Sequence, residues 1–171
     1  MAKAEHLEHR DVALLIGQAT MQWNEVHSYF FLTFMDCTGL DADMARAIFY
    51  SIPSDRAQRA LALVAVSELA GAGSPEAKGF QLIVKAAEAV AGKRNAAVHQ
   101  LWEQDPKSWA VRPNHSLHLH KAFKGGHIKV LKELDGDIGR IYVDYLEWNK
   151  SSYPILNERF KERRERNNFS E

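Results

Sequence analysis

The chain has 171 residues, of which 46% are hydrophobic and 10% aromatic, and such a length and composition suit one globular domain with a packed core. Its 22 Lys and Arg residues balance 22 Asp and Glu residues, which argues against an extended surface that follows nucleic-acid phosphates. No apolar run approaches the roughly 20 residues that cross a bilayer, and the first ten residues lack the apolar stretch of a signal peptide. The single cysteine, Cys37, cannot form an internal disulfide. The sequence therefore predicts a soluble, cytoplasmic protein with no membrane partner.

The first half of the chain is predicted to be helical. Apolar residues recur at alternating steps of three and four from His9 to Asp36, which is the pattern of an amphipathic helix. A shorter helix is expected from Asp41 to Ser51, and a third from about residue 54 to Ala70, where Ser54 or Asp55 can serve as the cap. Gly71–Pro75 is predicted to be a linker, with Pro75 suited to the first position of the next helix.

The segment Phe80–Trp102 is predicted to form one continuous helix. At about 100° per residue, Arg94 falls in the middle of its apolar stripe, where an arginine needs an anion or a hydrogen-bond acceptor. Asn95 lies beside Arg94, and His99 lies one turn beyond Asn95. The helix is therefore expected to present a guanidinium, an amide and an imidazole along one border of a packing face, with Trp102 completing that border.

The C-terminal part of the chain is predicted to contain a small β-hairpin and further helices. Trp109–Arg112 and Leu117–His120 alternate like two short strands, with Pro113-Asn114 as the turn between them. A helix is expected from Ile128 to Trp148, and Pro154 is expected to open a last helix. The predicted fold class is therefore all-α, with a hairpin and extra C-terminal helices.

The hexapeptide Arg94-Asn95-Ala96-Ala97-Val98-His99 resembles the signature of HEPN domains, in which an arginine is followed by a polar residue and then by a histidine. A long first helix, further helices and a motif on a late helix are also similar to that family. The resemblance covers about residues 9–102 and implies a HEPN-like up-and-down helical bundle as the core of a single domain, 1–171. The hairpin and the C-terminal helices, about residues 103–168, lie outside the resemblance.

The resemblance implies a metal-independent endoribonuclease that works as a homodimer, uses no cofactor and has a toxin, defence or stress role. In that mechanism His99 removes the proton of a ribose 2′-hydroxyl. Arg94 holds the phosphate oxygens and stabilises the charge of the transition state, and Asn95 orients His99 or the phosphate. The implied partners are an RNA substrate, a second copy of the chain, and an antitoxin or another protein.

A second class of function stays open, namely a non-catalytic HEPN-like helical dimer that acts as a protein-interaction or scaffold module. In that case Arg94 pairs with a carboxylate at a helix–helix contact, and His99 is a half-exposed surface histidine. A dimer that places both Arg94–His99 pairs in one open groove favours the nuclease. Burial of these pairs in salt bridges favours the scaffold.

Other histidines and the cysteine are predicted to be structural. His115, His118 and His120 form the densest histidine cluster, but no Asp, Glu or Cys lies at matching metal-ligand spacing, so a solvent-facing strand edge is favoured. His27 is expected in the core, and Cys37 is expected to be a structural thiol because no base lies near it in sequence. The chain contains no Glu-x-x-His, the metal signature of four-helix di-iron bundles. No metal site is predicted.

Overall fold

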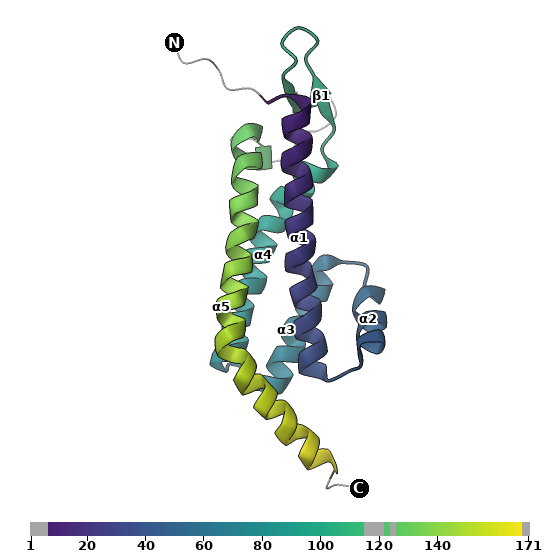
Figure 1. The fold of residues 1–171 in the computed structure, drawn as a ribbon, viewed down its shortest axis with the longest axis vertical. Helices are drawn as coiled ribbons and strands as arrows, with labels where there is room; N and C mark the ends of the chain where they lie inside the picture. The colour runs from purple at the N-terminus through teal and green to yellow at the C-terminus, as the bar shows by residue number, and fades with distance from the viewer. Residues whose placement is uncertain (1–6, 115–121, 124–125, 169–171) are drawn as a thin grey trace. The chain divides into compact units, whose positions relative to one another are not determined.

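The computed structural model describes residues 7–114, 122–123 and 126–168. Within these residues the chain forms five α-helices and one antiparallel two-stranded sheet (Figure 1), so the predicted helical class and the presence of a small hairpin are confirmed. None of the described helices combines the length and the apolar character that a membrane span requires. The elements are α1 (His9–Thr38), α2 (Ala42–Ser51), α3 (Asp55–Ala70), α4 (Pro75–His99), β1 (Trp102–Gln104), β2 (Val111–Pro113) and α5 (His127–Asn168).

Contacts along the backbone divide the chain into two compact units, and each unit draws on two separate stretches of sequence. Unit 1 consists of Met1–Asn24 and Ala89–Arg140, and unit 2 consists of Glu25–Glu88 and Ile141–Glu171. The helices α1, α4 and α5 therefore each contribute one part to each unit. The hairpin belongs to unit 1, whereas α2 and α3 belong to unit 2.

The helix boundaries in unit 2 coincide with capping residues in the sequence. The Asp41 carboxylate accepts hydrogen bonds from two backbone N–H groups of the first turn of α2, at 3.1 and 3.0 Å. The hydroxyls of Ser54 and Ser74 accept one such bond each in α3 and α4, at 3.4 and 3.1 Å. These acceptors satisfy donors that a helix start leaves without partners. Gly39, with a φ of 68°, comes directly after the last residue of α1.

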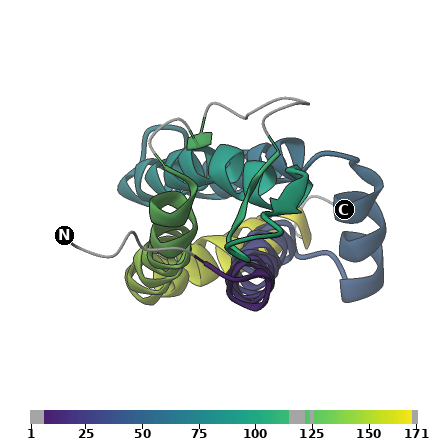
Figure 2. The ribbon, with the colours of Figure 1, turned by 90° about the horizontal axis from the view of Figure 1, so that it is seen from above.

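Unit 2 has an aromatic core. Phe49 fixes α2 to α1 because its side chain is fully buried and its ring centroid lies 5.6 Å from that of Phe31. Figures 1 and 2 show α2 beside α1, outside the other helices of this unit. Phe80 of α4 lies 5.7 Å from Phe30 of α1 and 4.7 Å from Trp148 of α5, measured between ring centroids. One aromatic cluster therefore joins α1, α4 and α5 within this unit.

Trp148 is held against the backbone of α4. Its indole Nε1 donates a hydrogen bond of 2.9 Å to the carbonyl oxygen of Glu76. A Cβ atom at Gly79 would lie only 2.8 Å from Cδ1 of the indole. Glycine costs a helix about 1 kcal/mol relative to alanine. This cost is offset at Gly79 because only a residue without a side chain lets the indole approach so closely.

We expect alanine substitutions at the two glycines of α4 to change the free energy of unfolding in opposite directions. Gly79→Ala should lower the free energy of unfolding by about 1–3 kcal/mol, the usual effect of overpacking. Gly92 has no atom within 4 Å of a Cβ placed there, so Gly92→Ala should raise that free energy by up to about 1 kcal/mol. Urea unfolding followed by circular dichroism measures both. Stabilisation by Gly79→Ala would contradict the contact with Trp148.

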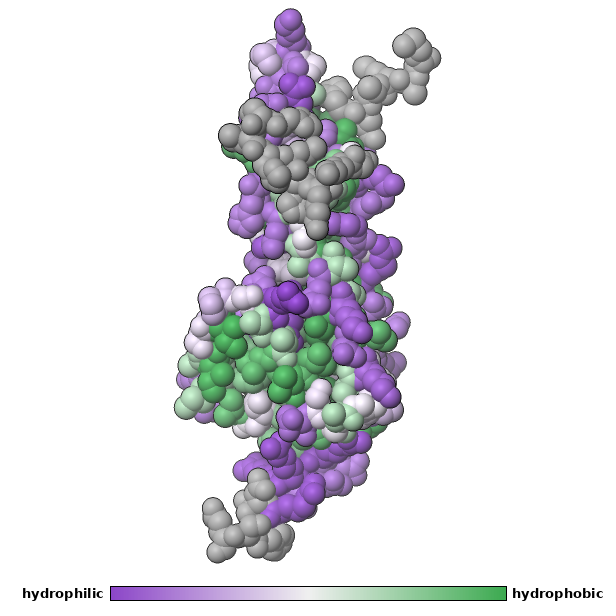
Figure 3. All heavy atoms as spheres, turned by 180° about the vertical axis from the view of Figure 1, so that it is seen from behind, coloured by the Kyte–Doolittle hydropathy of each residue, from purple (hydrophilic) through white to green (hydrophobic). Residues whose placement is uncertain are grey.

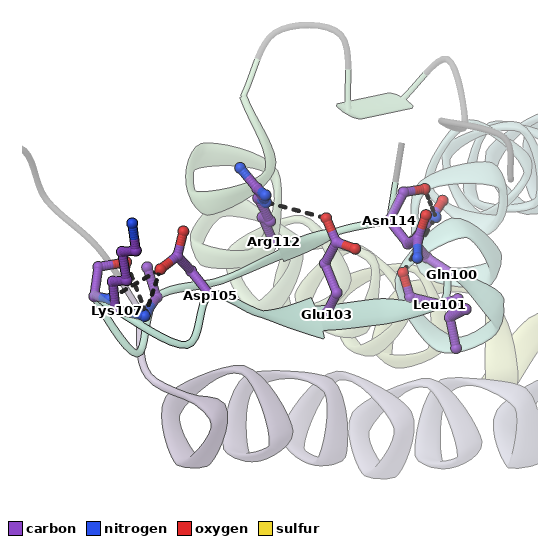
Figure 4. A network of polar contacts seen from close by, with 9 residues as sticks. Gln100, Leu101, Glu103, Asp105, Lys107, Arg112 and Asn114 are labelled. Carbon is purple, nitrogen blue, oxygen red and sulfur yellow. Dashed lines mark hydrogen bonds and ion pairs between the residues drawn. The ribbon is translucent and has the colours of Figure 1, made fainter. Parts of the chain in front are cut away.

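The hairpin of unit 1 is fixed by side-chain contacts around its turn (Figure 4). Glu103 pairs with Arg112 across the strands, and Arg112 Nε donates to Glu103 Oε1 at 3.1 Å. The Asp105 carboxylate accepts the backbone N–H groups of Lys107 and Ser108 at 2.8 and 2.9 Å. The bonds from Ser108 and Lys107 lower the pKa of Asp105. This side chain therefore organises the turn that connects β1 to β2.

The strands of this hairpin differ from the predicted ones. Trp102–Gln104 pairs with Val111–Pro113, so Trp109 lies in the turn and Pro113 lies in a strand rather than in the predicted turn. The predicted second strand, Leu117–His120, lies outside the described residues. The prediction missed the strand Trp102–Gln104 because it placed Trp102 at the end of the preceding helix.

The predicted helix Phe80–Trp102 is too long by three residues, because α4 ends at His99. The indole Nε1 of Trp102 donates a hydrogen bond of 3.1 Å to the carbonyl oxygen of Ala97. This bond satisfies one of the acceptors that a helix end leaves open. The Trp102 ring also packs against Phe123 at a centroid distance of 5.6 Å. Trp102 therefore terminates the helix and does not complete the border formed by the motif.

The prediction that Pro154 opens a separate helix is wrong, because Pro154 lies inside the continuous helix α5. A proline within a helix removes one backbone hydrogen bond and favours a bend, and Figure 1 shows α5 changing direction in its C-terminal third. The helix continues because it is packed on both sides of the proline. Ser152 before it and Leu156 after it are only 4% and 6% exposed.

Candidate functional site

The predicted site residues all lie in the last two turns of α4, within unit 1. Asn95 and His99 are exposed and lie one turn apart, so they face solvent on the same side of the helix. Arg94 is half-buried beside them. The helix thus brings the amide and the imidazole together on its surface and directs the arginine toward the packed interior.

The Arg94 guanidinium lies between an aromatic ring and an amide. Its central carbon is 5.9 Å from the centroid of Trp23, a residue of α1 that is only 3% exposed. This distance allows an attraction between the cation and the ring. Arg94 Nη1 donates a hydrogen bond of 3.0 Å to Asn95 Oδ1. Asn95 therefore orients the guanidinium of Arg94. The Asn95 amide forms no hydrogen bond with the His99 imidazole among the described residues.

Arg94 has no anionic partner among residues 7–114, 122–123 and 126–168. No carboxylate in this part of the chain forms an ion pair with it, and its Nε is buried without a hydrogen-bond acceptor. A buried donor without an acceptor costs about 1–3 kcal/mol. The pairing with a carboxylate that a purely structural role of Arg94 predicts is therefore not found in the described residues. The guanidinium keeps donor capacity for an external anion.

The neighbouring residue, Lys93, shows the contrasting arrangement. Its Nζ lies 2.8 Å from Oδ2 of Asp137 on α5, and Arg140 pairs with the same carboxylate. The Asp137 side chain is only 13% exposed. Burial raises the pKa of Asp137, but the hydrogen bonds and positive charges of Lys93 and Arg140 outweigh that effect and lower it. The carboxylate of Asp137 is thus already occupied by two cations.

We expect Asp137→Asn to lower the free energy of unfolding at pH 7 by about 1–3 kcal/mol, because it removes charged hydrogen bonds. The folded-state pKa of Asp137 lies below its ordinary value of about 3.9. Its stabilising contribution is therefore complete above that ordinary value and disappears as the pH falls through the folded-state pKa. Urea unfolding of both proteins from pH 7 down to acid measures this convergence.

The matched control is Asp144→Asn, which removes an exposed carboxylate that has no ion pair among the described residues. This variant should stay within about 0.5 kcal/mol of the wild type. A difference between wild type and Asp137→Asn that persists unchanged into acid would show that charge plays no part in the contribution of Asp137.

His99 is the last residue of α4, and its imidazole forms no hydrogen bond within the described part of the chain. It is therefore accessible to a substrate or to a second protein chain. One copy of the chain presents one such imidazole and one unpaired guanidinium at this place. This set can transfer one proton and bind one anionic group.

The other residues considered from the sequence have structural surroundings where the structure describes them. His27 is half-buried, and its ring centroid lies 5.8 Å from that of Phe49. Cys37 is buried, and burial together with the negative charge of Asp36 raises the pKa of its thiol to about 12. Such a thiol is a poor nucleophile at neutral pH, in agreement with the predicted structural role.

The histidine cluster His115, His118 and His120 lies outside the described residues. Within the described ranges, no group of three or more His, Cys, Asp or Glu side chains could hold a metal ion.

Sequence reasoning missed that the ring of Trp23 lies against the guanidinium of Arg94. Its spacing places Trp23 on the apolar stripe of the first helix, and nothing in that spacing links it to a residue of a much later helix. Sequence reasoning also missed that Lys93 would pair with Asp137, because this pairing depends on how α4 packs against α5 in unit 1.

Comparison of the chain with models of protein families, with curated proteins and with solved structures finds no match. The interpretation of the site therefore depends on its own chemistry. That chemistry consists of an unpaired guanidinium, an amide that orients it and an accessible imidazole on one helix end.

Proposed function

We propose that the chain is a HEPN-type endoribonuclease in which Arg94, Asn95 and His99 cleave RNA without a metal ion or cofactor. The observation that carries this proposal is the state of Arg94. Its guanidinium is half-buried and oriented by Asn95, yet it has no carboxylate partner in the described part of the chain. An RNA phosphate supplies the anion that this guanidinium lacks, because arginine binds phosphate oxygens through charge-assisted hydrogen bonds.

The proposed reaction is an internal transfer at phosphorus. His99 of one protomer takes the proton of a ribose 2′-hydroxyl. The 2′-oxygen then forms a bond to the adjacent phosphorus, and the bond from phosphorus to the 5′-oxygen of the next nucleotide breaks. The leaving 5′-oxygen takes a proton from a second imidazole. Arg94 stabilises the charge that builds on the phosphoryl oxygens. The products are a 2′,3′-cyclic phosphate and a free 5′-hydroxyl.

The need for a second imidazole supports a homodimer. Among the described residues, α4 itself carries one histidine, His99, in the same turns as Arg94. A second copy brings a second His99, so that one ring acts as base while the other acts as acid. A symmetric dimer with twofold symmetry is the commonest way to bring two copies of one surface together.

We expect His99→Ala to abolish RNA cleavage and to leave the fold intact, because the exposed imidazole makes no hydrogen bond among the described residues. Purified wild type and variant are incubated with total RNA in EDTA, and the new 3′ ends are tested for cyclic phosphate. The control is His9→Ala, which removes an exposed histidine from the first residue of α1, in the other stretch of unit 1. Cleavage by His99→Ala at the wild-type rate would disprove the assignment.

We also expect His99→Ala chains to inhibit the wild type when the two are mixed. Mixed dimers contain one imidazole where the reaction needs two, so cleavage should fall with the square of the fraction of wild-type chains. The two proteins are mixed and left until their subunits have exchanged. Native mass spectrometry verifies that mixed dimers have formed, and RNA cleavage is then measured. Mixing with His9→Ala should leave cleavage unchanged. Full activity of verified mixed dimers would show that each chain carries a complete site.

The second candidate is a non-catalytic helical dimer that binds a protein partner such as an antitoxin. It is favoured by apolar side chains that gather on one face of unit 2, over α2 and α3 (Figure 3). In these two helices Met44, Ile48 and Val64 are 51%, 39% and 55% exposed. Exposed apolar patches are typical of protein interfaces. Absence of cleavage by the wild type, together with stable dimers, would favour this candidate.

A further inference from the structure

An acidic groove in unit 2 shares no residue with the proposed nuclease site. It runs between the first turns of α4 and residues 144–155 of α5 and has a volume of about 710 Å³, which is within the range of small-molecule sites. Glu76 of α4 lines one side, and Asp144 and Glu147 of α5 line the other. Two apolar residues, Leu82 and Ile155, are 65% and 39% exposed and also line it.

The charges of this groove are all negative. No Lys or Arg lines it, and none of its three carboxylates forms an ion pair or a side-chain hydrogen bond within the described ranges. Asp144 and Glu147 are three residues apart on α5, so they are neighbours on one face of that helix. Three carboxylates without cations therefore line a single groove.

Glu76 provides the strongest indication that a ligand belongs there. The residue is only 7% exposed, and its Oε2 is buried without a hydrogen-bond partner. Its position in the first turn of α4 favours a negative charge, because the backbone dipoles of a helix are positive at that end. A buried carboxylate oxygen that accepts no hydrogen bond costs free energy. A bound ammonium group would remove that cost.

The arrangement of acceptors favours an extended organic cation over a metal ion. Within the described residues these carboxylates do not form a group that could hold a metal. A chain with several ammonium groups separated by methylene segments can reach both sides of the groove. Its methylene segments can contact Leu82 and Ile155. We propose that the groove binds a linear polyamine, and this proposal is independent of the proposed ribonuclease activity.

The test is a titration of the full chain with spermidine by isothermal calorimetry, in NaCl of about 0.15 M to screen charges more than about 8 Å apart. Wild type should show saturable binding to one site. Asp144→Asn combined with Glu147→Gln should weaken it at least about tenfold, because two charge-assisted contacts are lost. Both residues are exposed, so this variant should keep its helical circular dichroism spectrum.

The matched control combines Glu158→Gln with Glu165→Gln. It removes two exposed carboxylates from the same helix, outside the groove, and changes the net charge by the same amount. The control should bind spermidine within about twofold of wild type. Equal weakening by both double variants would overturn the proposal, since it would show a general attraction to surface charge. Absence of saturable binding to the wild type would also overturn it.

Glu76→Gln examines the buried acceptor alone, because the amide keeps the shape of the side chain and removes its charge. This variant should also weaken spermidine binding about tenfold. Unchanged binding would show that Glu76 is no part of the site and would overturn the proposal as stated. Titration with MgCl₂ at matched ionic strength is the last arm. If magnesium displaced spermidine completely when both supplied the same concentration of positive charge, the groove would be a divalent-cation site, and the proposal would be overturned.

Discussion

The close approach of Trp148 to the backbone of α4 determines how unit 2 is built. The indole lies on Gly79 and donates its hydrogen bond to the carbonyl oxygen of Glu76. This contact fixes α5 against the start of α4 and brings Trp148 within 4.7 Å of Phe80, measured between ring centroids. The acidic groove lies along the same contact. One aromatic side chain therefore positions both the core of this unit and the carboxylates at its surface.

A different balance holds in unit 1, where two adjacent cations, Lys93 and Arg94, have unequal partners. Asp137 accepts hydrogen bonds from Lys93 and Arg140, and these pairs contribute to the fold. Arg94 is adjacent in sequence to Lys93, yet it obtains only a neutral amide and an aromatic ring. Natural proteins often keep such unfavourable arrangements at functional sites and offset them elsewhere. The contacts of the Arg94 guanidinium within the described residues are therefore weaker than those of its neighbour Lys93.

The helices are predictable from the sequence because their signals are local. Asp41 and Ser54 cap α2 and α3, and apolar periodicity marks the long first helix. The end of α4 is not predictable in this way because it depends on a tertiary contact, the burial of the Trp102 ring against Phe123. From the sequence, Pro154 is expected at a helix boundary, because local propensities do not show that the helix is packed on both sides of this proline. Tertiary packing overrides local propensity in both places.

The same distinction applies to the candidate site. That Arg94, Asn95 and His99 lie along one border of a helix can be deduced from spacing alone. The bond from Arg94 to Asn95 and the position of Trp23 behind the guanidinium require two helices from distant parts of the sequence to meet. The sequence pattern also does not predict which residue pairs with Asp137, because the pairing depends on whether Lys93 or Arg94 faces α5.

The division of the chain into two discontinuous units has a consequence for its synthesis. Each unit combines a segment of α1 with a segment of α4 and a segment of α5. The motif on α4 leaves the ribosome well before residues 127–168, although unit 1 includes part of that last helix. Unit 1 can complete its packing only after the residues up to Arg140 have been translated, and unit 2 needs the part of α5 that follows Arg140. A nascent chain thus carries Arg94 before residues 127–140 are present to complete unit 1.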